Sequence, residues 1–139
     1  MAKSIREVMT QDAKTMKADE TLTSAAQAMK ESDIGCVLVM TGGKLHGLVT
    51  DRDIVVRAIA ENRDPSRTKL EEICTKETRT LSPDASVDDA VELMRKESIR
   101  RVPVVENGSP VGMVSLGDLA VERDPKSALG QISAAPPQS

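Results

Sequence analysis

The sequence predicts a mixed α/β (α+β) fold in which two copies of one β-α-β-β-α unit pack by pseudo-two-fold symmetry. Three observations lead to this prediction: an internal repeat, apolar residues at helical and strand spacing in each copy, and one short motif shared by both copies. A shift of 65 residues aligns residues 9–57 with 74–122 without a gap, and 13 of the 49 aligned positions are identical. Ordinary composition would give about one identity in fifteen. The chain therefore carries a duplicated unit.

Both copies show the same local signals. Thr21 and Ser86 are typical N-cap residues, and the apolar side chains after them recur at i, i+3, i+4 and i+7, which predicts a helix with one buried face. Gly42-Gly43 and Asn107-Gly108 separate apolar runs and predict hairpin turns. The other expected elements are a helical turn (4–9, 69–74), a short extended piece (14–16, 79–81), a buried strand (36–40, 102–105) and a returning strand (45–49, 111–114).

A last helix follows each returning strand. In the first copy its inward-facing residues are expected to be Ile54, Val55, Ala58 and Ile59. Each unit alone has little core, so the two are expected to pack together. The predicted domains are the first repeat with its linker at 1–66, the second repeat at 67–123, and a C-terminal extension at 124–139 whose end is predicted to be disordered.

Composition narrows the function classes. The chain has 139 residues and a formal net charge of −3, which argues against nucleic acid or an anionic membrane as partner. No apolar run approaches the roughly 20 residues of a membrane span, and the start has no signal-peptide core, so we expect a cytoplasmic protein. There is no Phe, Tyr or Trp. A flat ligand must therefore lie between aliphatic side chains, and aromatic platforms for single-stranded nucleic acid are excluded.

The shared motif points to a ribonucleotide. Residues 47–53 and 112–118 each contain a glycine, two apolar residues, a hydroxyl residue and an aspartate three positions further on. A hydroxyl between a strand and a helix caps the helix, and the free N–H groups of the first turn attract an anion. The aspartate lies beside the same helix start, where its carboxylate can accept two hydrogen bonds from a diol. The hydroxyl and acidic residues concerned are Thr50 with Asp53, and Ser115 with Asp118.

These residues carry a family resemblance. With "VMT" near the start, an "I-x-x-V-x-V" strand and "G-h-h-T/S-x-x-D", each unit resembles the CBS domain, named after cystathionine beta-synthase. Two in tandem resemble a Bateman module, over about residues 5–123. The first copy, at 22–27 and 45–55, resembles the stand-alone CBS pairs of the hypoxic-response protein family. The resemblance implies an adenosyl ligand (AMP, ADP, ATP, NAD or S-adenosylmethionine) in clefts between the repeats, and a homodimer.

The resemblance also implies roles for individual residues. The motif aspartate holds the ribose hydroxyls, the hydroxyl residue lies near the ribose or phosphate, and strand backbone reads the adenine. Basic residues before the strand meet phosphate, and the short first strands often line the cleft that belongs to the other repeat. The matching positions are Thr15, Val37, Thr50 and Asp53 in the first copy, and Thr80, Arg100, Arg101, Val102, Ser115 and Asp118 in the second.

The two copies differ at the phosphate positions, because Gly35 and Cys36 stand where the second copy has the arginines. The Asp118 cleft is therefore predicted to prefer phosphorylated ligands, and the Asp53 cleft to bind a less charged adenosyl group or nothing. Alternatives stay open. Each aspartate can be a solvated first-turn residue stabilised by the helix dipole. The arginines can pair with Glu97 or Glu106 at the surface, or reach a partner subunit.

Catalysis is not expected, and neither is a catalytic cofactor or a metal site. The chain has one histidine, two cysteines without CxxC spacing, and no Gly-rich phosphate loop. The sequence predicts a non-catalytic regulatory or sensor module that signals through repeat orientation or dimer assembly to an unknown effector protein. The alternative is a dimeric interaction scaffold without a ligand.

Overall fold

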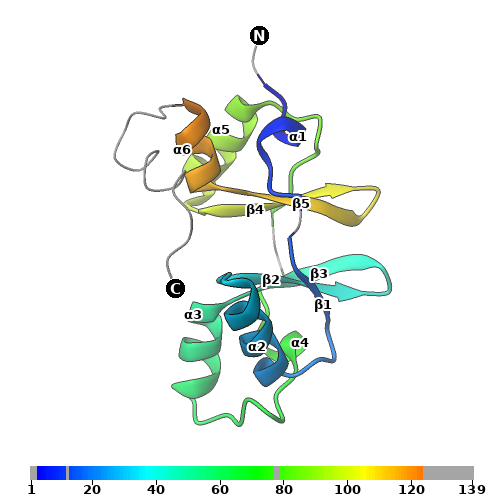
Figure 1. Cartoon of the computed structure of the whole chain (residues 1–139), viewed down its shortest axis with the longest axis vertical. Helices are drawn as coiled ribbons and strands as arrows, with labels where there is room; N and C mark the ends of the chain where they lie inside the picture. Colours follow the sequence, from blue (N-terminus) through cyan, green and yellow to red (C-terminus); the bar gives the residue numbers. More distant parts are fainter. Residues whose placement is uncertain (1–2, 12, 77–78, 124–139) are drawn as a thin grey trace. The chain divides into compact units, whose positions relative to one another are not determined.

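The structure is a computed structural model and describes residues 3–11, 13–76 and 79–123 (Figure 1). The chain forms two compact units, one made of residues 1–12 with 79–139 and the other of residues 13–78. The predicted mixed α/β fold with a duplicated element order is confirmed. The C-terminal extension predicted at 124–139 lies outside the described residues.

The unit formed by residues 13–78 contains a three-stranded sheet in the order β1-β2-β3. Strand β1 runs parallel to β2, and β3 returns antiparallel through the predicted hairpin. Helices α2, α3 and α4 lie on one side of this sheet (Figure 1). The elements are β1 (Thr15–Lys17), α2 (Leu22–Ser32), β2 (Cys36–Thr41), β3 (Lys44–Thr50), α3 (Asp51–Ile54), the π-helical η1 (Val55–Ile59) and α4 (Leu70–Ile73).

The other unit repeats this plan 65 residues later in the sequence. Strands β4 and β5 form an antiparallel pair with an irregularity at the same place as in the first hairpin. Where the first unit has β1, this unit has a single parallel bridge between Leu81 and Val104. Its elements are α1 (Ile5–Val8), α5 (Val87–Glu97), β4 (Arg101–Glu106), β5 (Ser109–Ser115) and α6 (Leu116–Arg123).

The long helices begin where their caps predict. The Thr21 hydroxyl accepts a hydrogen bond from the Ser24 amide at 3.2 Å, and the Ser86 hydroxyl accepts one from the Asp89 amide at 3.0 Å. In both hairpin turns the chain passes through positive φ, at 57° and 80° for Gly42-Gly43 and at 55° and 83° for Asn107-Gly108. These are the residue types that tolerate that conformation, so the turn prediction is confirmed.

Each unit is completed by a short helix that precedes the other repeat in the sequence. Ile5 of α1 is fully buried in the core that contains α5, and its amide donates to the Ala85 carbonyl at 2.8 Å. Leu70 of α4 is fully buried in the core that contains α2, and its amide donates to the Glu20 carbonyl at 2.9 Å. The compact units therefore exchange these helices relative to the division of the sequence into repeats.

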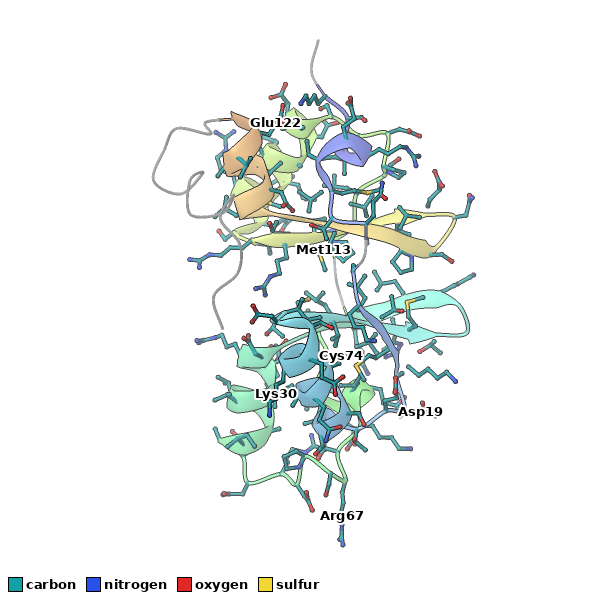
Figure 2. All side chains as sticks on the ribbon, viewed as in Figure 1. Asp19, Lys30, Arg67, Cys74, Met113 and Glu122 are labelled. Atoms are coloured by element: carbon teal, nitrogen blue, oxygen red, sulfur yellow. The ribbon has the colours of Figure 1, made fainter. Side chains whose placement is uncertain are left out.

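The exchanged segments explain the glycine of the shared motif. After α4 and its C-cap residue Cys74 (Figure 2), Thr75 pairs with β3 next to Gly47. A Cβ atom on Gly47 would lie 2.5 Å from the Thr75 carbonyl oxygen, and one on Gly112 would lie 2.8 Å from the Thr10 carbonyl oxygen. Only glycine permits this approach of two backbones, so the repeated glycine has a structural cause.

The helix after β3 corrects one expectation. Ile54 and Ala58 are buried as predicted, but Val55 and Ile59 are 58% and 50% exposed, so the prediction that they face inward is wrong. The helix widens here, because the Ala60 amide donates to the Val55 carbonyl five residues back, at 2.9 Å. The stripe of buried residues on this helix, made by Ile54 and Ala58, is correspondingly narrow. Within the described residues, no helix has the length and apolar character needed to cross a membrane.

Candidate functional site

The second repeat starts α6 with a reciprocal pair of hydrogen bonds. The Ser115 hydroxyl accepts from the Asp118 amide at 3.1 Å, and the Asp118 carboxylate accepts from the Ser115 amide at 2.9 Å through Oδ2. This capping box satisfies amides that have no partner within the helix. A carboxylate has about four acceptor positions, and within the described residues no other hydrogen bond or ion pair of Asp118 is formed. The Asp118 carboxylate therefore keeps acceptor positions for further hydrogen bonds.

Arg100 and Arg101 lie beside this helix start. Arg101 is the strand partner of Ser115, and the Arg100 carbonyl accepts from the Leu116 amide at 2.8 Å. Both arginine side chains are exposed, and no described residue forms an ion pair with either. The structure thus brings together Ser115, Asp118, Arg100 and Arg101, which we call the second-repeat cluster.

The surface pairing that the sequence left open for these arginines is not formed. Glu97 lies 3.4 Å from Arg79 instead, and Glu106 lies 3.1 Å from Arg6. Among the described residues, nothing pairs with the guanidinium groups of the second-repeat cluster, whose planar donor forks suit an anion.

The remaining two predicted residues of the second repeat contribute differently. Val102 is fully buried in the core, opposite Val114 on β5, so only its backbone is placed to meet a ligand. Thr80 is exposed and precedes Leu81, whose amide donates to the Pro103 carbonyl at 3.0 Å. Thr80 therefore lies next to the short segment that bridges β4 through Leu81.

The first repeat builds the same helix start. The Thr50 hydroxyl accepts from the Asp53 amide at 3.1 Å, and Asp53 Oδ2 accepts from the Thr50 amide at 2.9 Å. We call these two residues the first-repeat cluster. Its surroundings differ, because Cys36, the strand partner of Thr50, occupies the place of Arg101. In addition, Arg57 Nε lies 3.7 Å from Asp53 Oδ1.

Thr15 and Val37 repeat the pattern of Thr80 and Val102. Val37 is fully buried opposite Val49, so it offers only backbone to a ligand. Thr15 is exposed on β1, in parallel register with Leu38. Each predicted residue is therefore placed near the helix start of its own unit or along the adjoining strand.

Sequence reasoning missed Arg57. Its position four residues after Asp53 is the spacing at which a helical acid and base meet, and this signal could have identified the pair. The corresponding residue of the second repeat is Glu122.

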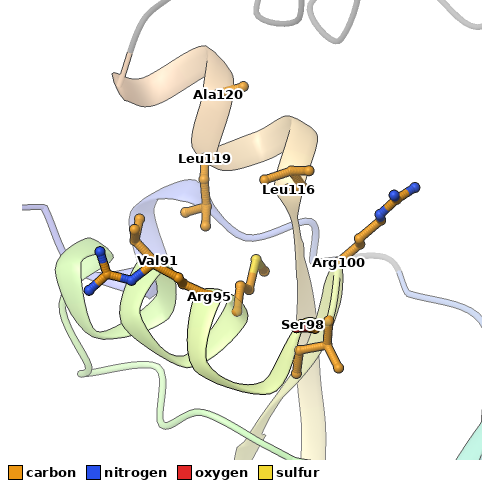
Figure 3. Close-up of a pocket in the computed structure, with 9 residues that line it drawn as sticks. Val91, Arg95, Ser98, Arg100, Leu116, Leu119 and Ala120 are labelled. Carbon is orange, nitrogen blue, oxygen red and sulfur yellow. The ribbon is translucent and has the colours of Figure 1, made fainter.

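The sequence also did not predict a hollow of about 520 Å³ between α5 and α6. Figure 3 shows Leu116 and Leu119 of α6 above Val91 of α5, with Arg95 and Arg100 at the margins. The hollow is apolar at its centre and cationic at its edge. Within the described residues, no group of three or more His, Cys, Asp or Glu side chains could hold a metal ion.

Comparison with known proteins assigns the family. The family model of the CBS domain matches residues 5–59 and 70–123. The CBS domain-containing protein YhcV of Bacillus subtilis is 37% identical over 127 residues, which are 91% of this chain and 90% of that protein. A putative signal-transduction protein with CBS domains from Burkholderia ambifaria superposes with a TM-score of 0.81 at 27% identity, covering 90% of this chain and 96% of its own.

A third similar protein is Hypoxic Response Protein I, solved with two coordinated zinc ions. It superposes with a TM-score of 0.77 at 33% identity over 86% of this chain and 98% of its own. The two matched segments coincide with the two copies of the internal repeat. The chain belongs to the CBS-domain family and contains two CBS domains in tandem.

Proposed function

We propose that this chain is a non-catalytic regulatory module whose two clusters bind an adenosyl ligand. Tandem CBS domains are typically regulatory modules. The observation that carries the proposal is the second-repeat cluster, in which an acidic acceptor, a helix start and two arginines without an ion pair to any described residue lie together. These groups complement a ribose diol next to a phosphate.

The proposed ligands are AMP, ADP, ATP, NAD and S-adenosylmethionine. Asp118 accepts hydrogen bonds from the ribose hydroxyls, and Ser115 lies close to the ribose or phosphate. Arg100 and Arg101 contact phosphate, while backbone beside Val102 meets the adenine edge. Because the first-repeat cluster has no arginine at the corresponding strand start, phosphorylated ligands prefer the second-repeat cluster.

The output of the module is a change in repeat orientation or in dimer assembly that an effector protein reads. Self-association is supported by exposed apolar side chains on helices of each unit. Clustered exposed apolar side chains mark interaction sites. Within the described residues, the exposed large apolar side chains are Val55, Val56, Ile59, Val91 and Leu116.

The proposal contains no catalytic step and no metal. Two zinc ions are coordinated in the Hypoxic Response Protein I structure. This chain has a single histidine, and its described residues contain no cluster of metal-ligand side chains. A position in the cytoplasm stays a prediction from the sequence.

A thermal-shift titration with the five ligands tests the proposal. A ligand at 100 times its dissociation constant stabilises the folded state by about 2.7 kcal/mol. Asp118→Ala should remove the response to phosphorylated ligands. The matched control is Asp89→Ala, because Asp89 forms the same capping box with Ser86 at the start of α5, with its carboxylate 3.1 Å from the Ser86 amide. Both variants lose a helix cap, but only the first loses the ribose acceptor.

The second candidate function, a ligand-free dimeric scaffold, is favoured by one observation. Both aspartates already have a structural role in their capping boxes. A wild-type protein that is stabilised by none of the ligands would support the scaffold. A ligand response that persists in a double Asp53→Ala, Asp118→Ala variant would refute the assignment of the residues.

A further inference from the structure

The charges one turn beyond the two capping boxes have opposite sign. In the first repeat Arg57 lies beside Asp53, with Nε and Oδ1 3.7 Å apart. In the second repeat the corresponding residue, Glu122 on α6 (Figure 2), points its carboxylate to Lys3 at 3.3 Å. Asp53 thus has a cation as ion-pair partner, whereas Asp118 forms no ion pair with a described residue.

Arg57 is held in place from two sides. Besides its ion pair with Asp53, its Nη1 donates to the Ile73 carbonyl at 3.0 Å, at the last residue of α4. The carbonyls at a helix end lack partners within the helix, so a guanidinium is well accommodated there. The side chain of Arg57 is 50% exposed and that of Asp53 is 17% exposed. The planar fork of Arg57 is therefore fixed next to a largely covered carboxylate.

This arrangement uses both oxygens of Asp53. Oδ2 serves the capping box and Oδ1 faces Arg57. In Asp118, Oδ2 serves the capping box, and within the described part of the chain Oδ1 has no partner. A diol that binds Asp53 has to share Oδ1 with a cation, whereas a diol that binds Asp118 does not.

We propose that Arg57 is a specificity-determining residue that weakens ribose binding at the first-repeat cluster and so makes the two repeats unequal. The inference rests on the proposed function, because it concerns the same clusters. It goes further by assigning the inequality to a residue outside the shared motif. It also names the affected part of the ligand, which is the diol. A cation attracts phosphate, so the weakening is largest for an uncharged nucleoside and smaller for a nucleotide.

Calorimetric titration of adenosine and AMP into paired variants tests this inference. In an Asp118→Ala background, where binding is confined to the first-repeat cluster, Arg57→Met should tighten adenosine binding about two- to fivefold, the range expected for a partly exposed ion pair. AMP should gain less. The matched control is Arg52→Met, which removes the same charge from an exposed residue of α3 that forms no ion pair with a described residue.

A reciprocal variant transfers the cation to the other repeat. In an Asp53→Ala background, Glu122→Arg places a guanidinium four residues after Asp118 and should weaken adenosine binding by a similar factor. Melting temperatures without ligand identify any variant that fails to fold. If Arg57→Met fails to fold, the effect of Glu122→Arg on adenosine binding tests the inference in the second repeat.

The outcomes separate the two proposals. A wild-type chain that binds no adenosyl ligand overturns the proposed function itself. If the wild-type chain binds and Arg57→Met leaves adenosine affinity unchanged, lowers it or shows no binding, Arg57 does not suppress the first-repeat cluster and the inference is overturned. A gain with Arg57→Met that Arg52→Met does not reproduce, together with a loss on Glu122→Arg, supports it.

Discussion

The two repeats start their last helix in the same way but surround that start with different charges. Thr50 with Asp53 and Ser115 with Asp118 form matching capping boxes whose hydrogen bonds agree within 0.1 Å. Around them, the first repeat has an ion-paired arginine, and the second has two arginines without ion pairs to described residues. The capping box is required by the backbone in both repeats, so it indicates the fold. The charges outside it are free to differ, so we expect them to set ligand preference.

The largest expected effects concern the glycine before each helix start. Gly47→Ala and Gly112→Ala should each lower the free energy of unfolding by about 1–3 kcal/mol, because the new Cβ atom overlaps a paired backbone. The loss should be greater at Gly47, where the Thr75 backbone oxygen would lie 2.5 Å from the new Cβ atom. At Gly112 the Thr10 backbone oxygen would lie at 2.8 Å, and the Met9 sulfur at 2.7 Å can move. Urea unfolding of both variants measures this. Equal stability to wild type would show that the exchanged segments do not pack as described.

A second difference between the repeats lies in phosphate contact. Arg101→Met should weaken AMP binding by about tenfold, the effect of losing a charge-assisted hydrogen bond. Adenosine binding should stay within about twofold, because the nucleoside has no phosphate. Calorimetry with both ligands checks the ratio. An equal loss for both would mean that Arg101 supports the fold of the cluster and does not contact phosphate.

The capping hydroxyls should be equally important in the two repeats. Thr50→Ala and Ser115→Ala each remove one N-cap acceptor, and each should lower the free energy of unfolding by about 1 kcal/mol. Chemical denaturation of the two variants provides the comparison. Because the two capping boxes have the same geometry, a much larger loss in one repeat would contradict the view that the two hydroxyls stabilise their helix starts equally.

The smallest expected effect concerns the residue packed against each glycine. Cys74 lies against Gly47 where Met9 lies against Gly112, and burial raises the pKa of the Cys74 thiol above its ordinary value of 9.0. A raised pKa in the folded state gives stability that is present below the unfolded pKa and is lost as pH rises through the folded pKa. Unfolding of wild type should therefore become easier above about pH 9, relative to Cys74→Ala. An identical pH dependence for both proteins would exclude this contribution.

Much of the fold could be predicted because its signals are local. The caps at Thr21 and Ser86 and the turn at Asn107-Gly108 depend on residues next to each other in the sequence, and the structure confirms them. The exchange of α1 and α4 could not be predicted. Ile5 and Leu70 occupy equivalent positions in near-identical patterns, and nothing in either pattern says which repeat buries it.

The candidate site, like the fold, could be predicted only where its signals are local in the sequence. The positions of Asp53 and Asp118 follow from the motif, but the hydrogen bond that Arg57 forms across the unit to α4 does not. The exposure of Val55 and Ile59 was mispredicted, because apolar periodicity indicates which face of a helix is buried but not how wide the buried stripe is. The π-helical turn makes the buried stripe narrower here.

The most direct measurement compares AMP with the same nucleotide lacking its 2′ and 3′ hydroxyl groups, titrated into wild type and into Asp118→Ala. If the Asp118 carboxylate accepts the diol, wild type should bind AMP at least about tenfold more tightly than the dideoxy form. Asp118→Ala should bind the two with nearly equal affinity. If wild type does not distinguish them, or if Asp118→Ala distinguishes them as well as wild type does, the carboxylate does not hold the ribose.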